Sequence, residues 1–271
     1  VDASAPAGLA GTWLLDPYDL TISTSPTTST DNNTDSAPVW NASDIGANVA
    51  VGQIANRLNA GTSVEITTGT AGGQSGNITW LSGANLNVTS ATRVSLSVVA
   101  NNDLLVESGV QIVSSAAPLD VDFSAGGGVR LAGTPSSPIR IASAGGNVSL
   151  TGAAGFGAGV WLQDATIDSG AGSISLVGVH AGSGGSGDGV RLESSSLVTA
   201  SGDVSLVGSG STSFASDPPV GGVGVRLTAG SSIVTGSGAI DIIGSGGNGG
   251  ESDGFGVGGA GGAGGSLEDS S

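Results

Sequence analysis

The chain is dominated by short stretches in which apolar and small polar residues alternate. Typical stretches are "VSLSVV", "VQIVS" and "DVSLV", and they are separated by Gly, Ser, Asn and Asp. Alternation with a period of two predicts strands with one buried face. Stretches this short, bounded by Gly and rich in β-branched residues, are not typical of helices. The pattern therefore predicts an all-β fold.

The second half of the chain is an internal repeat. Segments that begin with "GVRL" or "GVWL" contain Val129, Val160, Val190 and Val225, which stand 31, 30 and 35 residues apart. Each copy has three apolar stretches, and the differences in length fall mainly in the Gly-rich connection before the next copy. Three strands in about 30 residues predict one coil of a three-sided solenoid, in which each strand pairs in parallel with its copies in the neighbouring coils.

Residues 63–246 keep this rhythm and are predicted to form the solenoid. Residues 1–62 are predicted to be an N-terminal capping segment that contains a polar loop and a short helix, because the open end of a stack needs protection. Residues 247–271 are Gly-rich and are predicted to be either a linker or the start of a further coil.

The expected helix lies within "NASDIGANVAVGQIANRLNAG". Ser43 or Asp44 would be its N-cap, and Gly61 would end it. One face would carry the apolar residues Val51, Ile54 and Leu58. Before this helix, "GTWLLDPYDLTIS" is unusually aromatic for the chain. We expect its Trp13 to be buried against the first coils, with Trp40 and Trp80 as neighbours.

Composition narrows the possible functions. The chain has a formal net charge of −16, so a nucleic-acid partner, which needs a basic surface, is not expected. It has no Cys, which excludes disulfides and thiolate metal sites within it. It also has no Met, even at position 1, which we take to indicate a mature or internal fragment. No apolar run reaches the roughly 20 residues of a membrane-spanning helix.

The combination of "GTWLLDPYDLTIS", a Ser/Thr/Asn loop, "IANRLNAGTSVEITTGTAGGQSGNITW" and the strand repeats resembles an internal segment of filamentous haemagglutinin-like exoproteins. These are very large proteins of Gram-negative bacteria. The resemblance implies a right-handed parallel β-helix that is secreted and cell-surface associated. It also implies adhesion to a glycan or protein of a host or neighbouring cell, and an outer-membrane transporter for the parent protein. The "NPN"-type motif of the family's export domain is not found in this chain.

Two pairs of acidic residues are candidates for catalysis. Asp120 and Asp122 in "LDVDF" would project from one outer face, as the acids of a polysaccharide-cleaving enzyme do. Asp164 and Asp168 are a weaker pair. No further acid or His is placed beside either pair by the repeat, so a solvated strand face is the favoured interpretation. His180, the only His, is expected to be an exposed and inert loop residue.

Four residues occupy the same place in successive repeats and would form an outward column. They are Arg130, Trp161, Arg191 and Arg226. Trp161 would lie between guanidinium groups and stack with them. The column is interpreted first as a structural ladder and second as a contact surface for a glycan or an acidic partner.

Two Gly-rich stretches, "GGSGDG" and "GGNGGESD", resemble imperfect copies of the calcium-binding motif G-G-x-G-x-D. They make Asp188, Glu251 and Asp253 weak calcium candidates. Flexible corners are the favoured interpretation, and no cofactor is expected.

The leading hypothesis is therefore a non-catalytic structural and interaction segment of a secreted surface adhesin. A carbohydrate-active enzyme on the same fold, a polysaccharide lyase or hydrolase, is the alternative, since fold alone does not separate the two. A calcium-stiffened rod is a third possibility.

Overall fold

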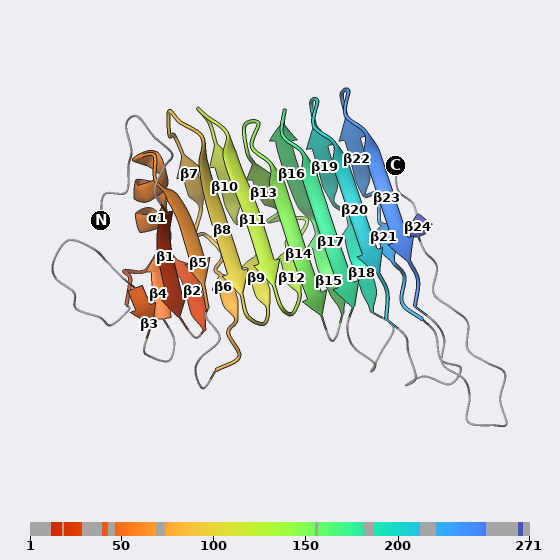
Figure 1. Cartoon of the computed structure of the whole chain (residues 1–271), viewed down its shortest axis with the longest axis horizontal. Coiled ribbons are helices and arrows are strands. Elements are labelled where there is room, and N and C mark those ends of the chain that lie inside the picture. Colours follow the sequence, from red (N-terminus) through yellow and green to blue (C-terminus); the bar gives the residue numbers. More distant parts are fainter. Residues whose placement is uncertain are drawn as a thin grey trace.

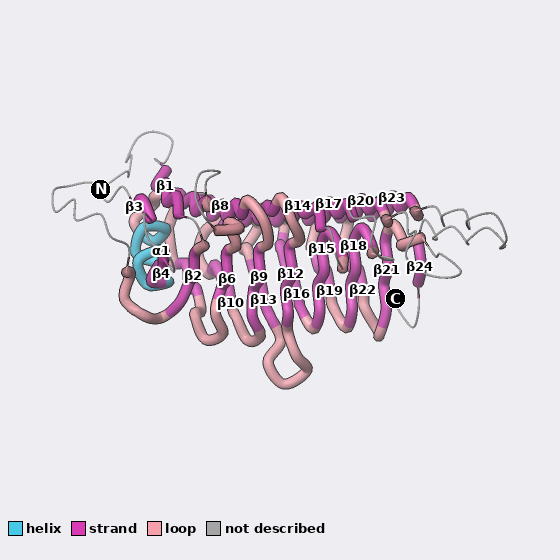
Figure 2. The backbone as a smooth tube through the Cα atoms, turned by 90° about the horizontal axis from the view of Figure 1, so that it is seen from below, coloured by secondary structure: helices cyan, strands magenta, loops and turns pink. Residues whose placement is uncertain are grey.

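The computed structural model describes residues 12–17, 19–28, 40–42, 47–68, 74–154, 157–180, 187–211, 221–247 and 265–267. Within these ranges the chain forms a parallel β-helix with three strands in each coil, which confirms the predicted fold class. The coils follow one another along the long axis, and the single described helix lies at the N-terminal end (Figure 1, Figure 2). That helix is not long or apolar enough to cross a membrane.

Three sheets, which we call A, B and C, run along the molecule. All of their strand pairs are parallel. In spatial order, sheet A contains β23 (Ile240–Ser245), β20 (Val204–Ser209), β17 (Ile174–His180), β14 (Val148–Ala154), β11 (Leu119–Ala125), β8 (Val94–Ala100), β5 (Ser63–Thr67), β1 (Thr12–Pro17) and β3 (Trp40–Ala42). Sheet B contains β24 (Gly265–Leu267), β21 (Val225–Thr228), β18 (Asp188–Glu193), β15 (Ala158–Gln163), β12 (Val129–Ala132), β9 (Leu104–Glu107), β6 (Ile78–Trp80), β2 (Leu20–Ser23) and β4 (Ala47–Ala50). Sheet C contains β22 (Ser232–Thr235), β19 (Ser196–Thr199), β16 (Ala165–Gly170), β13 (Ile139–Ala142), β10 (Gln111–Ser114) and β7 (Leu86–Val88).

Each full coil visits sheet B, then sheet C, then sheet A, from β6–β7–β8 to β21–β22–β23. The four repeat residues Val129, Val160, Val190 and Val225 are direct neighbours in sheet B, so the repeat read from the sequence is the coil.

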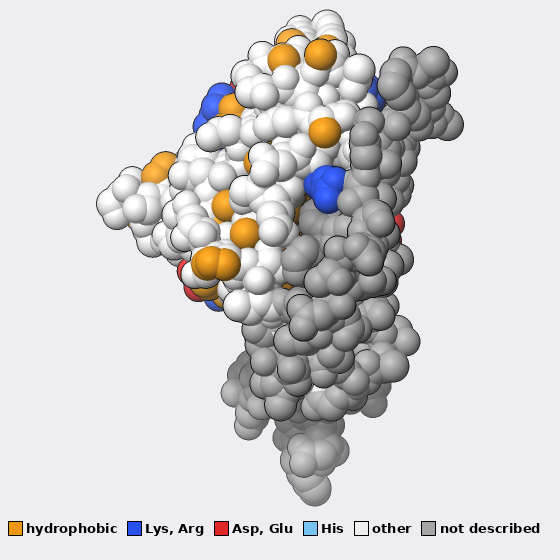
Figure 3. Space-filling view, turned by 90° about the vertical axis from the view of Figure 1, so that its left-hand side faces the viewer, with side chains coloured by type: hydrophobic (Ala, Val, Ile, Leu, Met, Phe, Trp, Pro, Cys, Tyr) orange, Lys and Arg blue, Asp and Glu red, His pale blue; other side chains and the backbone are white. Residues whose placement is uncertain are grey.

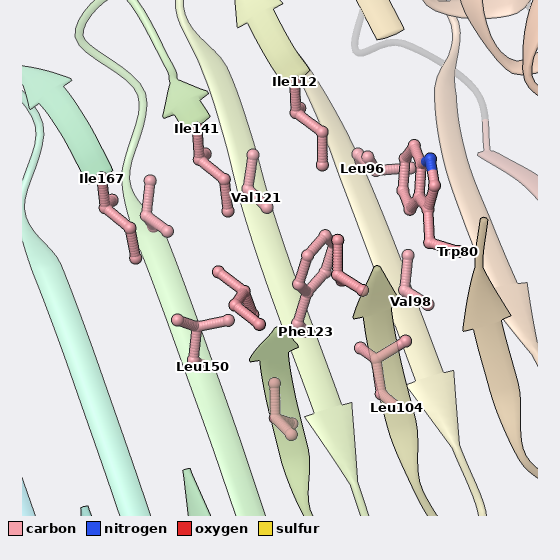
Figure 4. Close-up of a cluster of buried hydrophobic side chains, with 14 of the residues drawn as sticks. Trp80, Leu96, Val98, Leu104, Ile112, Val121, Phe123, Ile141, Leu150 and Ile167 are labelled. Carbon is pink, nitrogen blue, oxygen red and sulfur yellow. The ribbon is translucent and has the colours of Figure 1, made fainter. Parts of the chain in front are cut away.

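The inward-facing residues of the three sheets form one continuous apolar core. Figure 4 shows side chains such as Leu96, Ile112 and Ile141 pointing from different sheets into the interior. The two large aromatic residues of this core, Trp80 and Phe123, are fully buried, with ring centroids 6.2 Å apart. The indole N–H of Trp80 donates to the carbonyl of Ala84 over 2.7 Å, which satisfies its only polar group.

The corner between sheets C and A uses one device repeatedly. A Ser or Thr hydroxyl, buried in all but the last coil, donates to the carbonyl of the third residue after it, at Ser114, Ser143, Ser169, Thr199 and Thr235. In the last four of these the acceptor is a Gly, and a Cβ added there would lie about 2 Å from a carbonyl oxygen of the preceding coil. The small residues of the repeat are therefore required for close stacking at this corner.

The N-terminal segment does more than cap the stack, because it adds strands to two sheets. β1 pairs with β5 and β3 pairs with β1, while β2 pairs with β6 and β4 pairs with β2. The solenoid sheets thus extend upstream of residue 63. Trp13 and Trp40 lie in β1 and β3, and their side chains are outside the described part of the chain, as is the expected burial of Trp13.

The helix α1 (Val51–Asn59) buries the predicted face, Val51, Ile54 and Leu58. The predicted start was wrong, because Ala47–Ala50 is strand β4 and Ala50 takes the N-cap position. Parallel pairing with β2 holds these residues extended despite the helical periodicity that follows them.

From the N-terminal end, the apolar side chains on the visible described surface are scattered rather than gathered into one patch (Figure 3).

At the other end, β24 pairs with β21 and places one more strand in sheet B. This strand lies within the Gly-rich residues 247–271 and extends sheet B beyond β21. Apolar side chains of the last full coil are exposed, including Ile240, Ile242 and Ile243 of β23.

Candidate functional site

Sheet B carries a column of outward residues that passes through the middle of the molecule. From β6 onwards the register places Thr79 beside Leu105, Leu105 beside Arg130, Arg130 beside Trp161 and Trp161 beside Arg191. Outward positions in neighbouring strands of a parallel sheet lie about 4.8 Å apart. The column therefore brings together side chains that are distant in the sequence.

Trp161 lies between two guanidinium groups, as predicted. The Cζ atom of Arg130 lies 4.1 Å from the centroid of the indole, and that of Arg191 lies 4.7 Å from it. Since the two Arg residues come from the strands on either side of β15, they cover the ring from opposite sides. Each contact is a cation–π interaction.

The outer arginines of the column differ in their partners. Arg191 donates from Nη2 to Glu193 Oε2 over 3.0 Å. Arg226 stands beside Arg191 in register, but its guanidinium bonds to Asp188 from Nε and Nη2, over 2.8 and 3.2 Å. Arg226 therefore continues the column in register and is bonded to Asp188, while the contacts with the ring of Trp161 come from Arg130 and Arg191.

A groove of about 400 Å³ lies next to this stack. It crosses β6, β9, β12 and β15, and its lining includes Arg130 and Trp161. Thr79, Leu105, Asn77 and Asp103 also line it, so that polar and apolar groups alternate over the outer face of sheet B. The sequence placed the Arg and Trp residues of this site correctly but gave no signal for Asn77, Thr79 or Asp103, which come from less regular coils.

Asp120 and Asp122 lie on one outer face of sheet A, as predicted, but the carboxylate of Asp120 is already bound by other groups of the chain. It forms an ion pair with Arg93, with oxygen to nitrogen distances of 2.7 and 2.5 Å. Its Oδ1 also accepts the backbone N–H of Asn147 in the next coil over 2.8 Å. The hydrogen bond to Asp120 is the main reason that the pKa of Arg93 is raised. Asp122 is exposed and has no hydrogen bond to a described residue.

The bond from Asp120 to Asn147 belongs to a side-chain ladder that the sequence did not reveal. The side chains of Asp120, Asn147, Ser173 and Asp203 each accept the backbone N–H of the equivalent residue in the next coil. A second ladder, from Asp19 through Asn77 to Asp103 and Gly128, follows the start of sheet B. Irregular coil lengths hide both ladders in the sequence. Asp120, which was a candidate for catalysis, therefore helps to hold neighbouring coils together.

The weaker acid pair, Asp164 and Asp168, lies in or near a turn, and each residue has a local structural role. Asp164 has a positive φ of 43° and occupies the turn between β15 and β16. Asp168 Oδ1 accepts the backbone N–H of Gly170, two residues on, over 3.1 Å. This is a turn-forming contact of a kind common for Asp.

The prediction for His180 was wrong. It is the last residue of β17 and is 5% exposed, not a solvent-exposed loop residue. Gly187 makes room for it, because a Cβ at that position would lie 1.9 Å from the imidazole Cδ2. The Gly-rich stretch that looked like a flexible corner includes a close packing contact with the imidazole.

Of the calcium candidates, only Asp188 lies in the described part of the chain. Its side chain is 7% exposed, and its oxygens accept from Arg226 and from the backbone N–H of Val223. Glu251 and Asp253 lie outside the described residues. The described residues contain no group of three or more His, Asp or Glu side chains arranged to hold a metal ion.

Comparison with models of known protein families found no match. Comparison with curated proteins likewise found no similar sequence. The fold and the site define a parallel β-helix with a groove on one sheet, and the lining of this groove includes Arg130 and Asp103.

Proposed function

We propose that the chain is a structural and interaction segment of a large secreted bacterial surface protein, similar to the filamentous haemagglutinin-like exoproteins. It would contact a glycan or protein of a host or neighbouring cell through sheet B and would catalyse no reaction. The observation that carries this proposal is the Arg130–Trp161–Arg191 stack beside a groove. Arg130 in this stack is exposed, and no described acid forms an ion pair with it, in a chain whose net charge is −16.

The arrangement of the acids also supports binding over catalysis. Glycoside hydrolysis uses a pair of carboxyl groups, one as acid and one as base or nucleophile. Asp120 is bound to Arg93 and to a backbone N–H, and Asp188 is bound to Arg226. These contacts direct each carboxylate toward a neighbouring coil. The alternative, a carbohydrate-active enzyme on sheet A, would have to use Asp120 in spite of these bonds.

Binding and turnover can be separated in one experiment. The purified full chain is applied to immobilised surface glycans and to cells, and the same glycans are assayed for cleavage. We expect retention without shortening of the polysaccharide chains, and loss of retention in Arg130→Gln. Cleavage that disappears in both Asp120→Asn and Asp122→Asn would overturn the proposal in favour of the enzyme.

The cellular part of the proposal is tested by the parent gene. We expect it to encode a much longer secreted protein with a neighbouring gene for an outer-membrane transporter. A neighbouring set of sugar-degrading enzymes would instead favour the alternative.

A further inference from the structure

We propose that the groove on sheet B binds the carboxylate of an acidic polysaccharide, with Arg130 contacting the carboxylate and Trp161 acting as a positioning residue for Arg130. This inference rests on the proposed function, because it takes sheet B as the contact face. It adds the chemical class of the ligand and the role of each residue.

Arg130 is the cation available to a ligand in this groove. Its side chain is exposed and makes a single hydrogen bond, from Nη2 to Gln163 Oε1 over 3.4 Å. No carboxylate among the described residues forms an ion pair with it. Arg93, Arg191 and Arg226, in contrast, are paired with Asp120, Glu193 and Asp188. A planar guanidinium with free N–H groups is the side chain best suited to bidentate contact with a carboxylate.

Trp161 contributes through Arg130 rather than through its own contact with a sugar. Both faces of its ring are already covered by guanidinium groups, at 4.1 and 4.7 Å, so neither is open to a ligand. Its indole Nε1 is buried and has no hydrogen-bond partner among the described residues. The ring holds the guanidinium of Arg130 in place before a ligand arrives. Such pre-organisation lowers the entropy lost on binding.

The rest of the groove suits the hydroxyl groups of a saccharide. The Thr79 hydroxyl and the amide nitrogen of Asn77 make no hydrogen bond to a described residue, and both residues line the groove. Asp103 adds a carboxylate whose Oδ1 accepts the N–H of Gly128. The groove crosses four strands, so it spans roughly 14 Å at about 4.8 Å per strand. An extended chain with a carboxylate near Arg130 and hydroxyls near Thr79 fits this distribution.

An acidic peptide fits less well. Extended peptides commonly bind by adding a strand to a free sheet edge. The groove lies over β6, β9, β12 and β15, and each of these strands is paired on both sides.

The experiment uses polygalacturonate, its fully methyl-esterified form and poly-glutamate as probes of the full chain, by calorimetry at low ionic strength. We expect polygalacturonate to bind and the ester, which has the same backbone without charge, to bind at least about tenfold more weakly. Added salt should weaken the binding of polygalacturonate. Equal binding of the ester, or tighter binding of poly-glutamate, would overturn the proposed ligand class.

The variants separate the roles of the two residues. Arg130→Gln should weaken binding by about tenfold or more. The control Arg140→Gln removes the same charge from an exposed position in β13 on sheet C and should have no effect. Trp161→Leu should weaken binding and Trp161→Phe should restore part of it, because Phe keeps a ring under the guanidinium. Equal effects of Arg130→Gln and Arg140→Gln would overturn the assignment.

The same variants separate this inference from the function on which it rests. If polygalacturonate fails to bind but a neutral surface glycan is retained in a way that depends on Arg130, contact through sheet B stands and the acidic class is wrong. If no surface ligand depends on Arg130 or Trp161, both proposals fail. Thermal melting of every variant checks that each remains folded.

Discussion

At the scale of single residues, two of the acids that were candidates for catalysis or metal binding, Asp120 and Asp188, serve the stacking of coils. Asp188 is the clearest case. It is nearly buried, bonds twice to Arg226 and accepts the N–H of Val223, which lies 35 residues later. The Gly-rich sequence around Asp188 resembles a calcium-binding motif, but the partners of its carboxylate, Arg226 and Val223, come from the next coil.

The role of Asp188 can be measured. Asp188→Ala leaves a guanidinium and a backbone N–H without their acceptor, so we expect the free energy of unfolding to fall by about 1–3 kcal/mol. Denaturant titration of the variant against the parent chain provides the measurement. Asp122→Ala, which removes an exposed carboxylate on sheet A, is the matched control and should change little. A loss of stability no larger than that of the control would show that the ion pair is not structural.

His180 and Asp188 also show where sequence-based prediction stops. Repetition revealed Arg130, Trp161 and Arg191, since stacking places equivalent residues together whatever the details of the corners. The surroundings of His180 and Asp188 depend instead on Gly187 and on Val223 and Arg226, across connections that vary in length from coil to coil. No periodic signal marks such contacts.

At the scale of elements, strands were predictable and boundaries were less so. The alternating pattern identified the strands of the coils, and the apolar spacing identified the buried face of α1. The first turn expected for that helix is strand β4, because pairing with β2 overrides local helical preference. The strands β1 and β3 come from a segment without the repeat pattern, and their place in sheet A follows from pairing over long distances in the chain.

The requirement for Gly at the corner between sheets C and A can be tested by substitution. Gly202→Ala would place a Cβ 1.9 Å from the carbonyl oxygen of Gly172, which is backbone and cannot move alone. We expect this substitution to lower the melting temperature strongly. Gly52→Ala in α1 meets no atom within 4 Å and should instead stabilise the chain by roughly 0.5–1 kcal/mol. If both variants melted like the parent chain, close stacking at the corner would be refuted.

At the scale of the whole molecule, stability should vary along the axis. A solenoid coil contacts only its neighbours, so the middle coils are covered on both sides, whereas no further described strand pairs with β22 and β23 of the last full coil. Phe123 is fully buried in β11, whereas Ile240 in β23 is 48% exposed. We expect Phe123→Ala to cost about 3–5 kcal/mol and Ile240→Ala to cost clearly less. Amide exchange should be slowest in β11 and β14 and faster in β23. Uniform protection along the stack would contradict this gradient.

The effect of calcium on thermal stability is also a property of the whole molecule. Since the carboxylate of Asp188 is bonded to Arg226, we expect a chelator to leave the melting curve of the chain unchanged. The same scan with added calcium is the comparison. A transition that rises with calcium and falls with chelator would support a calcium-stiffened rod.

The measurement that most directly separates binding on sheet B from catalysis on sheet A is a crystal structure of the full chain with an oligogalacturonate. We predict an intact oligosaccharide over β6, β9, β12 and β15, with a carboxylate on the guanidinium of Arg130. An oligosaccharide on sheet A, cleaved or distorted over Asp120 and Asp122, would contradict the proposed function and identify an enzyme.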